Sequence, residues 1–392
     1  MNNENFVLNG KIKTTCFWGV FIGLLCFGLG LYIDPKRAWL NLLLNNFYFV
    51  SLGLGGLFFV SLQNVTNSSW SRPMSRITES FSSFLPISFL ITLGLFLGIH
   101  SLFEWSHHEV VMNDPILKGK AFYLNTTFFI ARTIAFFVVW ILLGKLLSHF
   151  SESQDNGKRV TLKKVTLFSV LFLIFFAYSY SFFSFDMIMS LEPHWFSTIF
   201  GIYTFSGLFV NILAVLTLTI ILLKEQGYLA HEINENHYHD LGKLLFGFST
   251  FWAYIWFSQY VLIWYANIPE ETVYFYLREH NTWDWLFYAN LFINWLIPFF
   301  ALMTRESKRR SFILKRVCIV LIIGHWLDLY VMIAPPIFKH AHVENPMIDW
   351  IEIGMALGFG ALFILVLSRR LSKRKLIPAN DLYLEEGIYL EQ

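Results

Sequence analysis

Charged residues are scarce in this chain of 392 residues. Only 14% of the residues are Asp, Glu, Lys or Arg, whereas a soluble domain carries about a quarter. The net charge of +2 is too small to predict binding to nucleic acid. Apolar residues instead make up 56% of the chain and aromatic residues 19%. This composition predicts a protein that lies largely within a lipid bilayer.

Cysteine is equally scarce. Cys16, Cys26 and Cys318 lie inside apolar runs, and no CxxC pair occurs. Three separated thiols cannot form a four-thiolate iron–sulfur or zinc site, and they indicate no disulfide framework. We therefore expect small buried apolar side chains at these positions. We assign the chain no metal site and no catalytic residue.

Ten apolar stretches are long enough to cross a membrane, which takes about 20 residues for about 30 Å of hydrocarbon. The stretches are too long and too continuous for the alternating strands of a barrel. The sequence thus predicts an all-α polytopic membrane protein with a single integral domain over 1–392. The predicted spans are 15–33, 40–62, 84–103, 122–147, 165–189, 197–223, 241–266, 284–303, 312–333 and 348–368.

Basic residues are sorted by loop. With the N-terminus placed inside, the inner segments hold 22 Lys and Arg residues and the outer segments hold 6, and Arg132 lies within a span. Cytoplasmic loops carry such an excess of positive charge. We therefore predict that both termini are cytoplasmic.

Three features outside this pattern carry further predictions. Residues 376–392 form an acidic cytoplasmic tail with Leu and Tyr between the acids, which is either a solvated terminus or a docking strip for a neighbouring protein. The outer segment 267–283 predicts a short surface helix. Gly354 and Gly358 in the last span fit a face on which another helix approaches closely.

Titratable side chains inside spans are costly and therefore mark candidate functional positions. His325 and Asp328 lie three residues apart on one face of span 9. An imidazole beside a carboxylate can relay protons near neutral pH. The structural alternative for Arg132, near the middle of span 4, is an ion pair with Asp186 or Asp328. The proton-path candidates are Arg132, Asp186, His325 and Asp328, with His237, His239 and Asp240 at the inner end of span 7.

Secondary candidates lie toward the outer side, where His100 and Glu104 close span 3 and Glu352 opens span 10. We expect Asp186, Glu104 and Glu352 to be hydrated at the interface. At the inner end of span 7, an exposed polar loop is the alternative to a proton mouth. Spans 5 to 8 also contain polar side chains that either carry a water chain or satisfy one another, namely Tyr178, Tyr180, Tyr203, Asn211, Tyr254, Gln259, Asn290 and Asn294.

Four stretches resemble a known family: DMIMSLEPHWFSTIFG at 186–201, NHYHDLGK at 236–243, WFSQYVLIWYANIPEET at 256–272 and GHWLDLY at 324–330. They are similar to the ActF family, the second quinone-binding-type membrane subunit of bacterial alternative complex III. That complex is a quinol:cytochrome c oxidoreductase, and its membrane subunits are related to the NrfD/PsrC type. The resemblance extends over nearly the whole chain.

The resemblance implies a multi-pass subunit of a respiratory electron-transport complex in the bacterial inner membrane. It implies two four-helix bundles, spans 2–5 and 6–9, flanked by spans 1 and 10. The implied partners are a multihaem cytochrome c subunit, an iron–sulfur subunit and an NrfD-like sister membrane subunit, with a haem–copper oxidase as a further candidate. Haem c and iron–sulfur clusters would belong to those partners, and this chain would carry no redox cofactor of its own. Contact of this chain with menaquinone or menaquinol stays open. The chain would support assembly and, as a further hypothesis, proton translocation.

Two alternatives remain at this stage. A stand-alone proton-coupled or ion transporter is expected to have spans broken at mid-membrane by glycine or proline, and only Pro298 lies deep within a span. A haem-b or quinone-binding redox protein is the other alternative. His100 and His325 would then serve as axial haem ligands.

Overall fold

The described part of the chain is helical. The computed structural model describes residues 6–155, 161–280, 283–340 and 348–390, and no β-strand occurs within these ranges. Eight helical segments of the described residues are long and apolar enough to cross a membrane, and each overlaps a predicted span. They are seven of the long helices given below and the segmented stretch Arg72–Leu102. The chain is therefore a multi-pass α-helical membrane protein. The count of ten crossings and the cytoplasmic placement of the termini stay predictions.

The long helices are α1 (Gly10–Ile33), α2 (Pro35–Thr66), α8 (Thr126–Asp155), α9 (Leu162–Met187), α10 (Phe200–Glu225), α11 (Glu235–Ala266), α16 (Ser311–His340) and α17 (Trp350–Leu371). Two further stretches, at the predicted spans 84–103 and 284–303, are segmented. One comprises η1 (Arg72–Met74), α3 (Ser75–Phe81), η2 (Ser82–Phe84), α4 (Leu85–Leu95), η3 (Phe96–Gly98) and α5 (Ile99–Leu102). The other comprises α13 (Asp284–Leu291), the π-helical η6 (Phe292–Leu296) and α14 (Ile297–Ala301).

The remaining helices are short. They are η4 (Glu104–Ser106), α6 (His108–Asn113), α7 (Pro115–Lys120), η5 (Met189–Leu191), α12 (Pro269–Glu279), α15 (Arg305–Arg309) and α18 (Leu384–Ile388). Helix α12 confirms the surface helix predicted within 267–283, of which residues 281–282 lie outside the described residues. Lys158, Arg159 and the last two residues of the predicted tail also lie outside them.

Capping residues and prolines explain where the helices begin and end. Asp34 separates α1 from α2, and its carboxylate accepts a hydrogen bond from the Arg37 backbone N–H, 3.2 Å away. Pro35 follows at the first position of α2, where proline costs no hydrogen bond. Asn67 and Asn267 end α2 and α11 in the left-handed conformation that favours asparagine.

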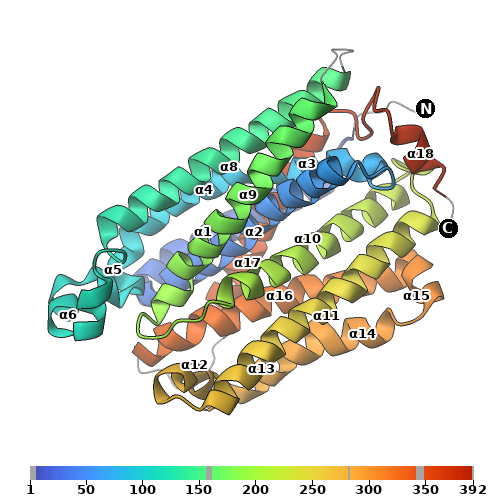
Figure 1. Ribbon diagram of the computed structural model, residues 1–392. Helices are drawn as coiled ribbons and strands as arrows, with labels where there is room; N and C mark the ends of the chain where they lie inside the picture. Colours follow the sequence, from blue (N-terminus) through green and yellow to red (C-terminus); the bar gives the residue numbers. More distant parts are fainter. Residues whose placement is uncertain (1–5, 156–160, 281–282, 341–347, 391–392) are drawn as a thin grey trace.

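The helices lie side by side in one elongated bundle, and Figure 1 shows both termini at the same end of it. We call this the terminal end, where α15 and α18 also lie, and the opposite end, with α6 and α12, the far end. Helix α2 forms the centre. It contacts α1, α9, α10, α16 and α17. Within its most apolar stretch of 18 residues, 94% of the residues are buried, against 28% in the corresponding stretches of α8 and α9.

Mutual contacts divide eight helical stretches into two groups of four, and α2 belongs to the first group. Helix α2 itself, the α3–α5 span, α8 and α9 contact one another, and α10, α11, the α13–α14 span and α16 contact one another. Helices α1 and α17 form a tight pair at the side. A Cβ atom on Gly23 would lie 2.7 Å from the Gly358 Cα. The predicted close approach at Gly354 and Gly358 is confirmed, because only glycine allows these two backbones to touch.

Two consecutive prolines lie inside α16, and an arginine compensates for them. Pro335 and Pro336 have no N–H, so the carbonyl groups four residues earlier, on Val331 and Met332, lose their helical partners. The Arg278 guanidinium donates to both carbonyls, through Nε at 3.0 Å and Nη2 at 2.8 Å. The arginine of α12 thereby satisfies backbone groups that the bilayer could not.

Candidate functional site

Four helices of one group converge on the Asp328 carboxylate of α16. Tyr203 of α10 donates its hydroxyl to Oδ1 at 2.5 Å, and Asn290 of α13 donates to the same atom at 2.7 Å. Trp252 of α11 donates to Oδ2 at 3.1 Å. All three donors are neutral, and Asp328 is 2% exposed. Among the described residues no Lys or Arg lies within ion-pair distance of Asp328.

His325 lies one turn from Asp328, as its sequence spacing predicts, but the two side chains are not hydrogen-bonded to each other. Its ring is 3% exposed and packs edge-on against Trp252. Neither ring nitrogen has a hydrogen-bond partner within the described residues. A buried imidazole without partners is costly, because a polar group removed from water loses its hydrogen bonds.

A small cavity opens beside these two side chains. Its volume is about 20 Å³, which is room for about one water molecule. It is lined by His325 and Asp328 and, across from them, by Tyr48, Ser51 and Asn211. Gly207 keeps it open, because a Cβ atom there would lie 3.6 Å from His325 Nδ1 and 3.7 Å from Asp328 Oδ2. A water in this cavity would have the polar partners that buried waters require.

The polar cluster continues from Asp328 along the segmented α13–α14 span. Asn294 donates to the Asn290 side chain at 2.6 Å and to the Gly324 carbonyl at 3.0 Å. Gly324 permits this contact, since a Cβ atom there would lie only 2.4 Å from Asn294 Oδ1. Asn294 lies within the π-helical segment, a distortion that often occurs at functional sites.

Helix α2 carries polar side chains that the sequence reasoning missed. The signal for them was the three- and four-residue spacing of Asn41, Asn45, Tyr48 and Ser51, which places them on one face. Tyr48 donates to Asn211 at 3.0 Å, and the hydroxyls of Ser51 and Tyr180 lie 3.1 Å apart. This face leads from the far end of the bundle to the cavity beside His325.

Most of the polar residues predicted to line spans 5 to 8 are buried near this cluster. Tyr180, Tyr203, Asn211, Asn290 and Asn294 all have hydrogen-bond partners within it. Gln259 is buried elsewhere and donates to Ser197, while Tyr178 and Tyr254 are exposed.

Arg132 and Asp186 form a separate, closed ion pair between α8 and α9. Arg132 Nε and Nη2 each lie 2.7 Å from an Asp186 oxygen, and Tyr123 donates a third hydrogen bond at 3.0 Å. The guanidinium also stacks over the rings of Tyr123 and Phe128. Of the two partners considered for Arg132, Asp186 is the one that the fold provides. Asp186 is fully buried, so the expectation that it is hydrated was wrong.

Glu352 is also buried, and its predicted hydration was wrong for the same physical reason. Arg37 binds it with two hydrogen bonds, Nε at 2.7 Å and Nη2 at 2.5 Å, and Asn41 donates a third at 2.8 Å. The Glu352 side chain also caps its own helix through the Asp349 N–H. This pair joins α2 to α17 at the far end.

The other secondary candidates lie near the surface at the far end. His100 is exposed, and its Nδ1 lies 3.0 Å from the Ser106 hydroxyl. Glu104 is half-buried and lines a separate cavity of about 430 Å³. Neither belongs to the Asp328 cluster.

The three candidates at the start of α11 do not share one role. His237 is buried and completes the helix cap, because its Nδ1 accepts from the Asn234 N–H at 3.1 Å. Burial lowers the pKa of His237. Asp240 forms an ion pair with Lys243, with 2.6 Å between Oδ1 and Nζ. His239 is half-buried on the same helix, two residues after His237. His237 therefore acts as a neutral donor and acceptor within the fold.

Comparison of the chain with models of known protein families and with curated proteins finds no match. The cavity beside His325 is too small for a quinone ring or a haem, so neither group fits there. Among the described residues no three His, Cys, Asp or Glu side chains are grouped in a way that could hold a metal ion.

Proposed function

We propose that this chain is a multi-pass subunit of a quinol-oxidising respiratory complex in the bacterial inner membrane, and that Asp328 is a proton-binding group within it. The Asp328 site is the single observation that carries the second part. A carboxylate buried among neutral donors can bind a proton, whereas one paired with an arginine stays ionised. His325 and the water-sized cavity offer the next position for a proton beside it.

The first part of the proposal rests on the resemblance of the four sequence stretches to the ActF family. The proposed partners are a multihaem cytochrome c subunit, an iron–sulfur subunit and an NrfD-like sister membrane subunit, with a haem–copper oxidase as candidate acceptor. Those partners would carry the haem c and the iron–sulfur clusters. The ten crossings, the two four-helix bundles and the cytoplasmic termini belong to this proposal.

The partners are tested by purifying the tagged chain in a mild detergent from its own membrane. The expected result is co-purification with proteins that show c-type haem absorption and an iron–sulfur electron paramagnetic resonance signal. A chain that purifies alone, folded and stable, contradicts the subunit assignment.

The proton-binding role is tested with Asp328→Asn in the intact complex, reconstituted into vesicles. We expect quinol oxidation to continue while the number of protons translocated per electron falls. The matched control is Glu109→Gln, which neutralises an exposed carboxylate on α6 and should leave the ratio unchanged. An unchanged ratio in Asp328→Asn contradicts the role, and loss of assembly would show that the cluster is structural.

A stand-alone ion transporter is the second candidate function, and one observation favours it. The α13–α14 span is interrupted by the π-helical segment and by Pro298, and its Asn290 and Asn294 point to the buried cluster. Interrupted spans form ion sites in transporters. Ion flux by the purified chain in vesicles, without any partner protein, would support this candidate over the first.

A further inference from the structure

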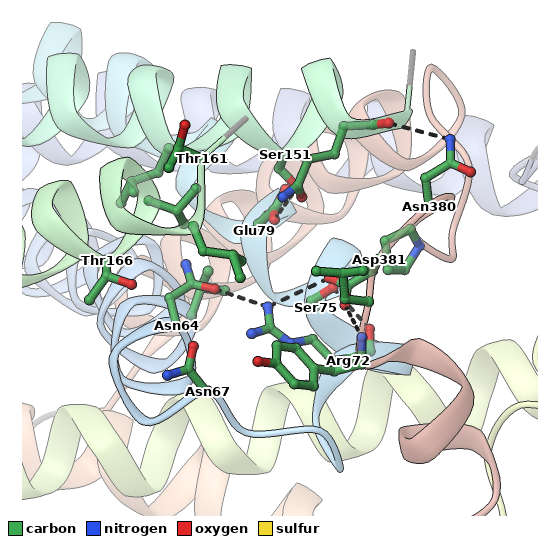
Figure 2. Close-up of a pocket in the computed structure, with 18 residues that line it drawn as sticks. Asn64, Asn67, Arg72, Ser75, Glu79, Ser151, Thr161, Thr166, Asn380 and Asp381 are labelled. Atoms are coloured by element: carbon green, nitrogen blue, oxygen red, sulfur yellow. Dashed lines mark hydrogen bonds and ion pairs between the residues drawn. The ribbon is translucent and has the colours of Figure 1, made fainter. Parts of the chain in front are cut away.

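A chamber of about 620 Å³ lies at the terminal end, far larger than the cavity beside His325. Its walls come from the end of α2, from α3 and from the facing ends of α8 and α9. Asn64, Arg72, Glu79, Ser151 and Thr166 line it, as Figure 2 shows. A space of this size has room for many water molecules.

The chain's own C-terminal segment forms the remaining wall. We call residues 377–390 the cover segment, and Asn380 and Asp381 of this segment face the chamber in Figure 2. The Ala379 N–H donates to the Asp155 carboxylate at 2.7 Å. Arg72 Nη1 lies 3.7 Å from Asp381 Oδ2, and its guanidinium lies over the Tyr383 ring at 5.7 Å.

A second set of contacts holds the C-terminal part of the cover segment, beyond the chamber. His237 Nε2 donates to the Gly387 carbonyl at 3.0 Å, and the Asn236 side chain donates to the Leu390 carbonyl at 2.8 Å. Gly387 packs directly on the α2–α3 turn, where a Cβ atom would lie 2.4 Å from the Ser69 carbonyl oxygen. The predicted acidic tail therefore docks on its own chain.

These attachments are mostly polar. In the part of the cover segment from Asp381 onward, only Leu384 and Gly387 are buried, whereas Leu382 and Tyr389 are 79% and 78% exposed. A segment with little buried apolar surface belongs to the less stable parts of a fold. It can therefore detach while the helices stay folded.

The chamber that the cover segment borders contains a titratable group, Glu79. Glu79 is 8% exposed and accepts from Ser151 at 2.6 Å, with Arg76 at 3.3 Å and Arg374 at 3.4 Å. The carboxylate lines the chamber that the cover segment closes.

We propose that the cover segment is a detachable lid that controls the access of water and small polar solutes to the Glu79 chamber. The ion pair of Arg72 with Asp381 and the contacts of His237 and Asn236 hold the lid shut.

The test introduces a reporter cysteine in the chamber, Thr166→Cys, and treats inverted membrane vesicles with a membrane-impermeant maleimide. Gln226→Cys, exposed at the same end but outside the chamber, is the matched reporter. The three native cysteines are buried, and the unaltered chain gives their background. The two reporters are then compared in the full chain and in a chain that ends at Leu376.

We expect Thr166→Cys to react about tenfold more slowly than Gln226→Cys in the full chain, which corresponds to a lid open about a tenth of the time. In the chain that ends at Leu376 the two rates should be similar. Equal rates of Thr166→Cys in both chains, or slow reaction in both, would overturn the proposal.

A single substitution tests the lid should the shortened chain fail to insert. Asp381→Asn keeps the hydrogen bond from the Tyr383 N–H, at 2.9 Å, but removes the charge that faces Arg72. We expect labelling of Thr166→Cys to rise about twofold to threefold, as the loss of one partly exposed ion pair implies. Labelling that does not change in this variant would contradict the role of the ion pair.

Discussion

Two buried carboxylates in the same bundle, Asp186 and Asp328, have opposite surroundings. Asp186 faces a guanidinium with two hydrogen bonds of 2.7 Å, and its charge is balanced within the protein. Asp328 faces a hydroxyl, an amide and an indole, none of which carries a charge. Beside Asp328 lie an imidazole without a hydrogen-bond partner among the described residues and room for a water, whereas the Arg132 guanidinium of the Asp186 pair lies over two aromatic rings.

The difference separates a structural use of charge from a chemical one. Breaking a buried ion pair leaves a charge without compensation, so both partners must be kept for stability. A carboxylate among neutral donors can gain or lose a proton without disrupting an ion pair. Position in the sequence did not distinguish the two, since both were proton-path candidates.

The largest effect is expected from Arg132→Ala, which leaves the Asp186 charge buried without its partner. The free energy of unfolding should fall by about 3–5 kcal/mol, measured as thermal unfolding in detergent. The double variant Arg132→Met, Asp186→Leu removes both charges and should recover most of the stability. A single variant as stable as the unaltered chain would show that the pair contributes nothing.

Arg278→Met extends the comparison to a second paired arginine. Its guanidinium binds Glu192 at 2.8 Å and the two carbonyls freed by the prolines of α16. We expect a loss of about 2–3 kcal/mol in thermal unfolding, because buried carbonyl groups lose charged donors. Arg278→Lys should recover only part of it, since an ammonium cannot reproduce the planar fork. Full recovery by lysine would contradict this geometry.

Asp328→Asn should change stability little, in contrast to the arginine variants. An asparagine still accepts from Tyr203 and Asn290, and only the bond from Trp252 is lost, which costs about 1 kcal/mol. A loss of 3 kcal/mol or more, about that of a broken ion pair, would contradict the comparison between the two carboxylates. Thermal unfolding of Asp328→Asn and Arg132→Ala in the same detergent decides it.

The smallest effect concerns His237 and the cover segment. Burial lowers the pKa of His237, the hydrogen bond to Gly387 and the charge of Asp240 raise it, and Lys224 lowers it. Burial is the largest of these causes, so we expect the docked state to favour the neutral ring and the detached state to bind the proton more readily. Docking should be strongest above the ordinary histidine pKa of about 6.5 and should weaken as the pH falls below it.

The labelling rate of Thr166→Cys, divided by that of Gln226→Cys at each pH, should therefore rise between pH 7.5 and pH 5.5, a window about one unit to either side of the ordinary histidine pKa. In His237→Gln, which keeps a donor without titrating in this range, the ratio should be flat. A rise of equal size in His237→Gln would assign the pH dependence to another group.

Several features could be predicted from the sequence because they depend on the bilayer alone. The apolar stretches locate eight described helices, since a span must be long and apolar wherever it packs. Gly354 and Gly358 predicted a close helix contact, which the pair α1–α17 confirms. The same reasoning placed His325 and Asp328 on one face, because the spacing in a helix is local.

The partners of each side chain could not be predicted in this way. Glu352 and Asp186 were expected to be hydrated, but Arg37 and Arg132 reach them from other helices. The polar face of α2 was visible as spacing, yet nothing local showed that it meets His325. The docking of the tail depends on contacts with Asn236 and His237, about 150 residues earlier in the chain.

The sequence by itself determined that the chain is a multi-pass helical membrane protein and which charged and polar groups enter the spans, because hydropathy and helical periodicity act within one helix. The tertiary structure alone decided which of those groups are neutralised. A charge buried at low dielectric is governed by the neighbour within about 4 Å, and that neighbour comes from another helix. Asp186 thus became an ion pair, and Asp328 remained a carboxylate among neutral donors.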